Sequence, residues 1–329
     1  MNKLFAKLRK AVTTAAGEGG DFIPAPLSDT FISYVRDKNF LRQLFTVKKM
    51  SAKTLDIPKI LGKTKVYYQP TELASAIKTD ITTGTIRLTA KKFMAQADLS
   101  EEVLEDTTNI GSIVKDDFAA SLAAAEEEAM LVGDPDHTPT TATESLADET
   151  TWFTKDHRII FYGLVTLAGD IAGVLEDDTR AANRVDAGGA DMSTALARQA
   201  KYNLGKYGRV YNDLILIINP WSANQLLDDP KLVTLEKYGP NATIFTGEFG
   251  KLYGKMRVIE SSYMPDTYGL ITHVGNPIIG DRRLYKLKTM PDITVDGMQY
   301  VITSRIDFTI MHKAALCQIH NLDAPTSVS

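Results

Sequence analysis

The chain has 329 residues, of which 44% are hydrophobic and 24% charged. This composition is typical of globular domains and excludes a disordered, collagenous or coiled-coil protein. The longest aliphatic run, at 214–218, has five residues, whereas about 20 are needed to cross a bilayer as a helix. The single cysteine, Cys317, excludes an internal disulfide framework and a cysteine-rich zinc site. We expect a soluble protein of roughly two domains in a reducing compartment.

The net charge of −4 is unevenly distributed along the chain. Residues 1–65 carry 13 Lys/Arg against 5 Asp/Glu, whereas the remaining residues carry 24 against 36. A basic arm on an acidic body predicts that the arm docks on an acidic surface, and we favour another copy of this chain as that surface. The alternative is nucleic acid or a membrane surface, since residues 1–16 place apolar side chains at the spacing of an amphipathic helix.

Two extended segments follow the basic arm. Residues 51–61 favour a strand, and residues 85–90 alternate apolar with polar side chains, which is the period-2 pattern of a half-buried strand. The residues between them include few large apolar groups. A long two-stranded hairpin with so thin an apolar face is marginally stable alone in water. We therefore predict that the hairpin lies on another subunit.

Two helices are predicted after the hairpin. Asp98-Leu99-Ser100-Glu101 has the form of a capping box and predicts a short helix that packs Leu99 and ends near Asp106. A longer helix is predicted from Ile110 to Val132, closed by Gly133-Asp134-Pro135. Its apolar stripe follows steps of three and four residues and comprises Ile110, Ile113, Val114, Phe118, Leu122, Ala125 and Ala129.

Three consecutive glutamates, Glu126 to Glu128, lie on the last turns of this longer helix. The helix dipole disfavours negative charge at that end, so the three side chains require an explanation. Either they form a solvated face, or they pair with basic residues of a neighbouring subunit. Both alternatives stay open on the sequence alone.

The second half of the chain has the pattern of an α/β unit inserted into an α+β body. Residues 134–150 form a Thr/Asp/Pro-rich connector, and residues 176–190 favour an exposed loop. The predicted elements are a helix at 191–205 beginning at Asp191 or Ser193, a buried strand at 213–219, a helix opening at Asn219-Pro220-Trp221, a strand at 255–260, and strand-like residues at 281–322 in which Ile306, Phe308 and Ile310 alternate with Asp307, Thr309 and Met311.

The segment Gly247 to Lys255 superficially resembles a phosphate-binding loop. Only three residues separate Gly250 from Gly254-Lys255, and Met256 stands where the loop requires Ser or Thr. We interpret the segment as a turn before a strand. A nucleotide-using enzyme built on it is a remote alternative.

Histidines do not assemble a recognisable catalytic or metal motif. His312 and His320 would share one face of a strand while Cys317 points to the other, which is poor geometry for zinc. His137 and His157 lie in or near the connector without a Gly-x-Ser-x-Gly or similar nucleophile motif. We therefore expect no enzyme: no catalytic, cofactor-binding or metal-ligating residues, and no cofactor.

The order of several motifs resembles tailed-phage major capsid proteins of the HK97-like fold. These motifs are the Pro24-Ala25-Pro26 arm, Leu99-Ser100-Glu101-Glu102-Val103-Leu104-Glu105-Asp106, the helix ending Leu131-Val132-Gly133-Asp134-Pro135, Ile218-Asn219-Pro220-Trp221, Leu252-Tyr253-Gly254-Lys255-Met256-Arg257-Val258 before Met264-Pro265, and Arg305-Ile306-Asp307. Each motif is loose alone, and their order and spacing make the resemblance specific. It covers nearly the whole chain from about Phe22.

The resemblance implies an α+β fold with four parts. They would be an N-terminal arm at 1–50, an extended β-hairpin loop at 51–92, a peripheral domain with the long spine helix at 93–140 and 281–329, and an inserted α/β axial domain at 141–280. It implies a major capsid protein that self-assembles as pentamers and hexamers into an icosahedral shell enclosing phage double-stranded DNA. An encapsulin-like shell around protein cargo is the alternative within the same fold.

The implied partners are further copies of the chain, a portal, a decoration protein, and packaged DNA held by non-specific contact, with no membrane. Because only about twenty residues precede the arm, we expect a separate scaffolding protein or none, and no large propeptide. The implied location is the virion, after assembly in the host cytoplasm. Some relatives cross-link subunits by a Lys–Asn isopeptide bond, for which Lys63 or Lys65 with Asn321 would be the candidates; we do not favour such a bond here.

Overall fold

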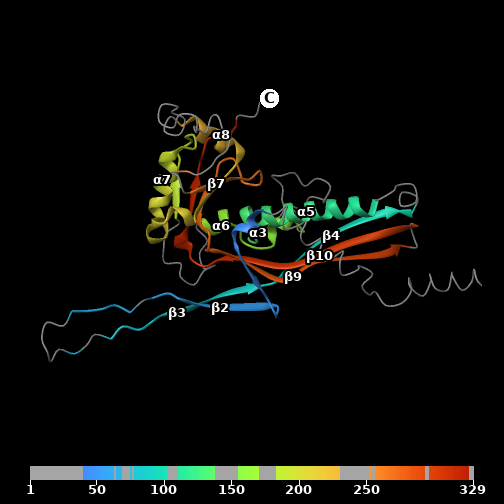
Figure 1. Cartoon of the computed structure of the whole chain (residues 1–329), viewed down its shortest axis with the longest axis horizontal. Helices are drawn as coiled ribbons and strands as arrows, with labels where there is room; N and C mark the ends of the chain where they lie inside the picture. The colour runs from blue at the N-terminus through green and yellow to red at the C-terminus, as the bar shows by residue number, and fades with distance from the viewer. Residues whose placement is uncertain are drawn as a thin grey trace, which may run out of the picture.

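The structure, a computed structural model, describes residues 40–62, 64–68, 75, 78–101, 110–137, 155–169, 183–229, 252, 256–292 and 296–325. Two sheets with helices between and around them, and a separate two-stranded hairpin, make up these residues (Figure 1). This mixture of helices and strands agrees with the α+β class expected from the sequence.

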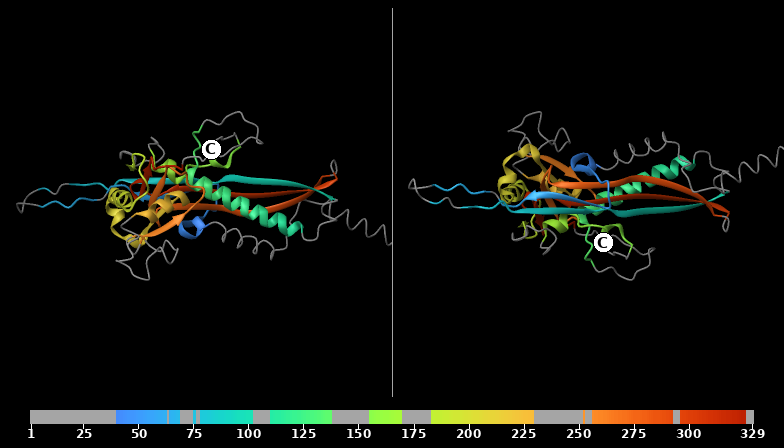
Figure 2. Two further views of the ribbon diagram at one scale, coloured as in Figure 1. Left: turned by 90° about the horizontal axis from the view of Figure 1, so that it is seen from above. Right: turned by 90° about the horizontal axis from the view of Figure 1, so that it is seen from below.

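The first sheet has four long strands in the order β1-β9-β10-β4. β10 runs antiparallel to both β9 and β4, whereas β1 runs parallel to β9 at the edge. Strands β9 and β10 run together with β4 to one end of the molecule, as Figure 2 shows. The strand bounds are Thr46–Lys49 (β1), Lys91–Ser100 (β4), Pro277–Asp292 (β9) and Gly297–Ile310 (β10), and the short helix α3, Phe40–Leu44, precedes β1.

A long helix, α5, lies along this sheet (Figure 2) and spans Ile110–Val132, which confirms the predicted bounds. At 1.5 Å per residue it is roughly 35 Å long. Phe118, Leu122 and Ala129 of the predicted stripe are buried against the sheet core. The helix ends at Gly133, where an added Cβ would lie 2.3 Å from the carbonyl oxygen of Phe161. Glycine is needed there because the following chain passes so close.

The second sheet has five strands in the order β5-β11-β8-β6-β7. All five residues of β6 are buried, as a continuous aliphatic run inside a sheet requires. Its bounds are Arg184–Asp186 (β5), Leu214–Ile218 (β6), Arg257–Glu260 (β7), Gly269–His273 (β8) and Leu316–His320 (β11). The strand predictions at 213–219 and 255–260 are confirmed.

Helices cover both faces of this second sheet. Successive side chains of β6 alternate between the two faces, so Ile215 and Ile217 join the core around α5, whereas Leu216 and Ile218 join the core under α7 and α8. The helix bounds are Leu164–Ala168 (α6), Thr194–Asn203 (α7) and Pro220–Asp228 (α8), with 3₁₀ turns at His157–Ile159 (η2), Gly205–Arg209 (η3), Tyr211–Asp213 (η4) and Lys313–Ala315 (η6).

Side-chain caps fix where α7 and α8 begin. Ser193 Oγ accepts a hydrogen bond from the Leu196 N–H, and Asn219 Oδ1 accepts one from the Trp221 N–H. Both residues belong to the group that favours the N-cap, and Pro220 suits the first turn because its missing N–H is not needed there. The predicted starts of both helices are confirmed.

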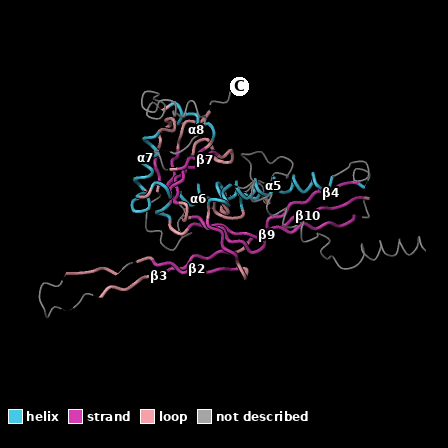
Figure 3. The backbone as a smooth tube through the Cα atoms, viewed as in Figure 1, coloured by secondary structure: helices cyan, strands magenta, loops and turns pink. Residues whose placement is uncertain are grey.

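The third unit is an antiparallel hairpin of β2, Thr54–Ile60, and β3, Thr83–Thr89. It projects away from both sheets as a thin arm (Figures 1 and 3). Its base is anchored to the four-stranded sheet, because Leu88 is buried in a small cluster with Met50 and Ile278. The two predicted extended segments therefore pair as a hairpin.

Asp307 strengthens that anchor. The alternation of the sequence predicts that Asp307 lies on the polar face of β10, but the residue is buried because the base of the hairpin covers that face. Its carboxylate accepts a hydrogen bond from the Thr89 N–H at 2.5 Å. Burial raises the pKa of Asp307 to about 6.

The cap predicted at Asp98 is misplaced, because residues 98–100 continue strand β4, and the helix expected to follow begins at Glu101. Leu99 and Ser100 belong to β4 and pair with Met298 and Gly297 of β10. Ten residues of β4 alternate in exposure, and this long ladder outweighs a local four-residue signal. The rest of that predicted helix, up to Asp106, lies outside the described residues.

The two sheets draw strands from distant parts of the chain. β1 comes from the predicted arm and pairs with β9, while β11 comes from the C-terminal segment and pairs with β8 and β5. The division of the chain into arm, loop, peripheral and axial domains stays a prediction.

Candidate functional site

Three consecutive glutamates of α5 contact three different parts of the molecule. Successive residues on a helix point about 100° apart, so Glu126, Glu127 and Glu128 reach different neighbours. We call these three residues and their partners the glutamate hub. For Glu126 and Glu127, which are 0% and 4% exposed, neither alternative of the sequence analysis holds. Their partners lie in the same chain.

Glu126 joins α5 to α3 and β9. The Arg42 Nε donates to Glu126 Oε2 at 2.7 Å, and Arg42 Nη1 donates to Asp281 Oδ2 at 2.9 Å. The Tyr285 hydroxyl donates to both oxygens of Glu126 at 3.1 Å. One guanidinium therefore holds two carboxylates inside the protein, and removal of Arg42 would leave both buried without their counter-charge.

The pKa values in this cluster reflect burial and paired charge. Burial raises the pKa of Glu126, and the Arg42 charge opposes that shift. Burial alone would lower the pKa of Arg42, but Glu126, Tyr285 and Asp281 raise it well above its ordinary value, so the guanidinium stays charged. Burial, together with the Glu126 charge, raises the pKa of the Tyr285 hydroxyl, which stays protonated and available as a donor.

Glu127 joins α5 to the five-stranded sheet. The Ser261 hydroxyl donates to Glu127 Oε1 at 3.0 Å, and Ser261 is itself held by its N–H, which donates to the Ile218 carbonyl at the end of β6 at 3.0 Å. No cation among the described residues forms an ion pair with this carboxyl, and burial raises the pKa of Glu127 to about 7. The nearby Tyr263 hydroxyl has a raised pKa because of its burial and of the charges of Glu127 and Glu128.

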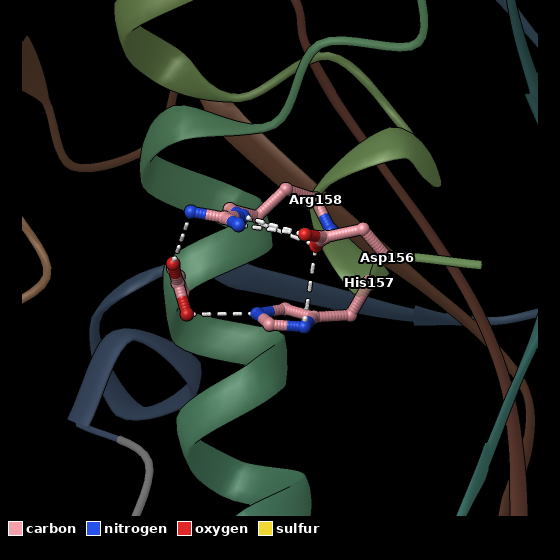
Figure 4. A network of polar contacts seen from close by, with 4 residues as sticks. Asp156, His157 and Arg158 are labelled. Carbon is pink, nitrogen blue, oxygen red and sulfur yellow. Dashed lines mark hydrogen bonds and ion pairs between the residues drawn. The ribbon is translucent and has the colours of Figure 1, made fainter. Parts of the chain in front are cut away.

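Glu128 joins α5 to the segment that contains η2. Its Oε2 lies 2.7 Å from His157 Nε2, and its Oε1 lies 3.5 Å from Arg158 Nη1. Asp156 closes the network, since its Oδ2 accepts from Arg158 Nη2 at 2.6 Å and its Oδ1 lies 3.5 Å from His157 Nδ1. Figure 4 shows the labelled side chains turned toward α5. Burial opposes ionisation of Asp156, but the hydrogen bonds from Arg158 outweigh it and lower the pKa of this carboxyl.

The polar contacts of the glutamate hub hold separate elements of the subunit together. Its carboxylates are engaged by a guanidinium, an imidazole or hydroxyl groups, and no serine or cysteine nucleophile contacts His157 in the described network. The arrangement ties α3, α5, η2 and both sheets together. It contributes structural cohesion to the subunit.

The other sequence candidates do not assemble a site either. Cys317 is buried in β11, where burial raises the pKa of its thiol to about 12, and His312 stacks on Tyr207 with ring centroids 5.5 Å apart. Among the described residues, no group of three or more His, Cys, Asp or Glu is placed to hold a metal ion. Nor does any described helix have the length and apolar character to cross a membrane.

Most of the Gly247–Lys255 segment lies outside the described residues. Leu252 pairs with Met256 in an antiparallel bridge directly before β7. This agrees with a turn before a strand. Of the cross-link candidates, Lys63 lies outside the described residues, and the Asn321 Nδ2 donates to Asp186 Oδ1 at 3.2 Å in the same chain.

The hairpin is the second functional feature. Large apolar side chains near its projecting end face water: Ile60 is 62%, Val66 97% and Tyr68 88% exposed. Tyr67 and Ile81, at 45% and 59%, add to this surface. An apolar surface of this kind on a soluble protein marks a contact with another molecule.

Comparison with known proteins identifies the family. The model of the phage capsid family matches residues 19–204, which is more than half of the chain. The chain belongs to the phage capsid family. A search of curated proteins finds no match.

Solved capsid structures share its fold. A capsid of a native GTA particle matches with a TM-score of 0.65 and 17% identity, over 87% of this chain and 90% of that one. The mature capsid of bacteriophage PhiM1 matches with a TM-score of 0.61 and 11% identity, over 88% of each chain. The procapsid of satellite phage P4 with its size determination protein matches with a TM-score of 0.56 and 13% identity, over 90% of this chain and 100% of that one. These structures show that the chain has the HK97-like fold. Its membership of the phage capsid family makes it a capsid component, a structural protein.

Sequence reasoning missed the partners of the three glutamates. Arg42 is 84 residues from Glu126 and 239 from Asp281. No local pattern marks a pair that distant in sequence. The sequence indicated only that partners were needed. Three acidic side chains lie at the C-terminal end of a helix, where the helix dipole disfavours negative charge, so they require counter-charges or hydrogen-bond donors from other elements.

Proposed function

We propose that this chain is a major capsid protein that self-assembles as pentamers and hexamers into an icosahedral shell enclosing phage double-stranded DNA. The family membership supports the shell. The ring stoichiometry, the enclosed DNA, the host cytoplasm as the place of assembly, and partners such as a portal or a separate scaffolding protein are part of the proposal.

The exposed hairpin is the observation that carries the proposal. Isolated two-stranded hairpins are marginally stable in water, and this one presents Val66 and Tyr68 almost fully to solvent. Burial of each such side chain on a partner contributes about 1.5–3 kcal/mol. The hairpin leads away from the body of its own chain (Figure 1), so the surface that would cover it belongs to another subunit. Repeated in every subunit, this contact links neighbours into a shell.

The fold alone does not distinguish a genome container from a protein-cargo compartment. We favour the genome container because the matched family is that of phage capsids. The two kinds of shell differ in whether they enclose nucleic acid or protein, and this difference can be measured directly.

Negative-stain microscopy of particles that contain this chain, with the 260/280 nm absorbance ratio of the same fraction, tests the proposal. Icosahedral particles rich in nucleic acid are expected. Closed particles with a protein-like ratio and co-purifying proteins would indicate a cargo compartment. A monomer or small oligomer that forms no particles would contradict the shell itself.

A further inference from the structure

One end of the layer formed by α7 and α8 is strongly basic. Residues 192–212 contain four cations and no acidic residue, although the chain beyond residue 65 has an excess of acidic groups. Three of these cations, Arg198, Lys206 and Arg209, are exposed. Lys206 and Arg209 lie in η3, directly after the C-terminal end of α7.

Exposed aromatic and apolar side chains lie among these cations. Tyr202 is 83% and Val210 is 54% exposed. Gly208 packs tightly on the end of α7, since an added Cβ would lie 2.4 Å from the Lys201 carbonyl oxygen. This close approach holds η3 against the helix, so the cations and Tyr202 form one fixed surface. We call Arg198, Tyr202, Lys206, Arg209 and Val210 the basic end.

The opposite end of the layer is acidic. The Gln225 Nε2 donates to Asp191 Oδ1 at 3.0 Å and lies 3.4 Å from Asp323 Oδ2, so one amide gathers two carboxylates. Asp228 is exposed on the last turn of α8. The adjacent Asp229 accepts hydrogen bonds from the backbone N–H and the hydroxyl of Thr194 at 2.7 Å, and so joins α8 to the start of α7. We call Asp191, Asp228 and Asp323 the acidic end.

α7 separates the two ends by its length, ten residues or about 15 Å. The helix dipole favours acids at its N-terminus and cations at its C-terminus, which accounts for the signs of the two ends. It does not account for the exposure of Tyr202 and Val210. Two different, complementary surfaces on one subunit are what a head-to-tail contact needs to close a ring.

We propose that the basic end of one subunit packs on the acidic end of the next around the axis of each ring. This inference rests on the proposed shell function and names the surfaces that build its rings. Ion pairs between the ends would select the neighbour and its register, while Tyr202 and Val210 would be removed from water.

A second copy fits the basic end better than nucleic acid does. The Tyr207 ring already has two partners, because the Lys206 ammonium lies 4.9 Å from its centroid and His312 stacks on it. The ring is therefore not free to stack on a base. Phosphate contacts would also leave Tyr202 and Val210 in water, whereas a protein surface buries them.

Charge reversal tests the contact. In Lys206→Glu/Arg209→Glu, like charges would face each other between neighbouring subunits of the ring and repel. We expect particle yield to fall more than about tenfold. Lys206→Arg/Arg209→Lys keeps the charges and is the matched control. Adding Asp228→Lys/Asp323→Lys to the reversed protein should restore assembly, and thermal unfolding of the free subunits verifies that each variant is folded.

Tyr202→Ser supplies a second readout that does not depend on charge. Because Tyr202 is 83% exposed, the substitution leaves the core packing of the subunit unchanged. Reduced assembly there, with reversal and rescue as described, supports the contact. Normal particles from the reversed protein overturn it while the shell function stands. Normal particles with a lower 260/280 nm ratio overturn it in favour of DNA. No particles from the unaltered chain would overturn the shell function itself.

Discussion

The glutamate hub and the hairpin differ in where their interactions are completed. Arg42 and Glu126 are 7% and 0% exposed, and Arg42 bonds to Glu126 and Asp281 of the same subunit. Val66 and Tyr68 are 97% and 88% exposed and lie on a hairpin that leads away from the body. The hub therefore determines the stability of the folded subunit, and the hairpin determines its association. Mutations in the two regions should separate these properties.

Loss of Arg42 should have the largest effect. Arg42→Ala removes the counter-charge of two buried carboxylates, and a broken buried ion pair costs about 3–5 kcal/mol. We expect the free energy of unfolding of the subunit to fall by about that amount, as measured by urea denaturation. Assembly would fail only as a consequence.

Arg87→Ala is the matched control for that variant. Arg87 pairs with Asp56 on the hairpin at 2.8 Å, with both side chains largely exposed. Exposed pairs contribute little to stability, so the unfolding midpoint of the subunit should stay unchanged. Equal destabilisation by the two substitutions would contradict the role assigned to the hub.

Polar substitution on the hairpin should show the converse behaviour. Val66→Asp/Tyr68→Asp removes apolar surface that, on our proposal, is buried only after assembly. Each side chain contributes about 1.5–3 kcal/mol on burial, so the concentration needed for assembly should rise more than about tenfold, with no change in the melting temperature of the free subunit. Light scattering and differential scanning calorimetry measure the two properties. Normal assembly would show that the hairpin is not a subunit contact.

Glu127 should make subunit stability depend on pH. Its pKa is about 7 in the folded state, above the ordinary value of 4.5, so the folded protein binds this proton more tightly than the unfolded chain does. Its contribution to stability is thus fully present below about pH 4.5 and is lost as the pH rises through about 7. Glu127→Gln stays neutral at every pH.

The difference in stability between the Glu127→Gln variant and the wild type isolates this effect. Relative to wild type, the variant should gain on the order of 1 kcal/mol between pH 5 and pH 8, allowing for partial solvent screening. Denaturation curves of both proteins across that pH range measure how the difference in their free energies of unfolding changes with pH. A constant difference would show that Glu127 does not titrate there.

His157→Ala should have the smallest effect. The pair of His157 with Glu128 is partly exposed, at 32% and 23% of the two side chains, and such pairs contribute up to about 1 kcal/mol. Arg158→Ala, which breaks the more buried pair with Asp156, should cost more. Thermal melts of both variants rank the two pairs, and the opposite order would contradict this reading of the network.

The elements that the sequence predicts well are those defined by local patterns. α5 follows from an apolar stripe and a terminal glycine, β6 from a continuous aliphatic run, and α8 from Asn219-Pro220. The cap at Asp98 was misplaced because the ten-residue strand ladder with β10, a tertiary interaction, extends through Ser100, so that the helix begins only at Glu101. The partners of Glu126 could not be predicted, because they come together only when α3, α5 and β9 pack.

Hydrogen exchange of backbone amides in free subunits and in assembled particles tests the division between hub and hairpin most directly. Amides of α5 near Glu126 should be strongly protected in both forms, since their contacts are complete in one chain. Amides of the projecting part of the hairpin, at 60–62, 64–68 and 78–83, should exchange rapidly in the free subunit and become protected in particles. Equal hairpin exchange in the two forms would contradict the account.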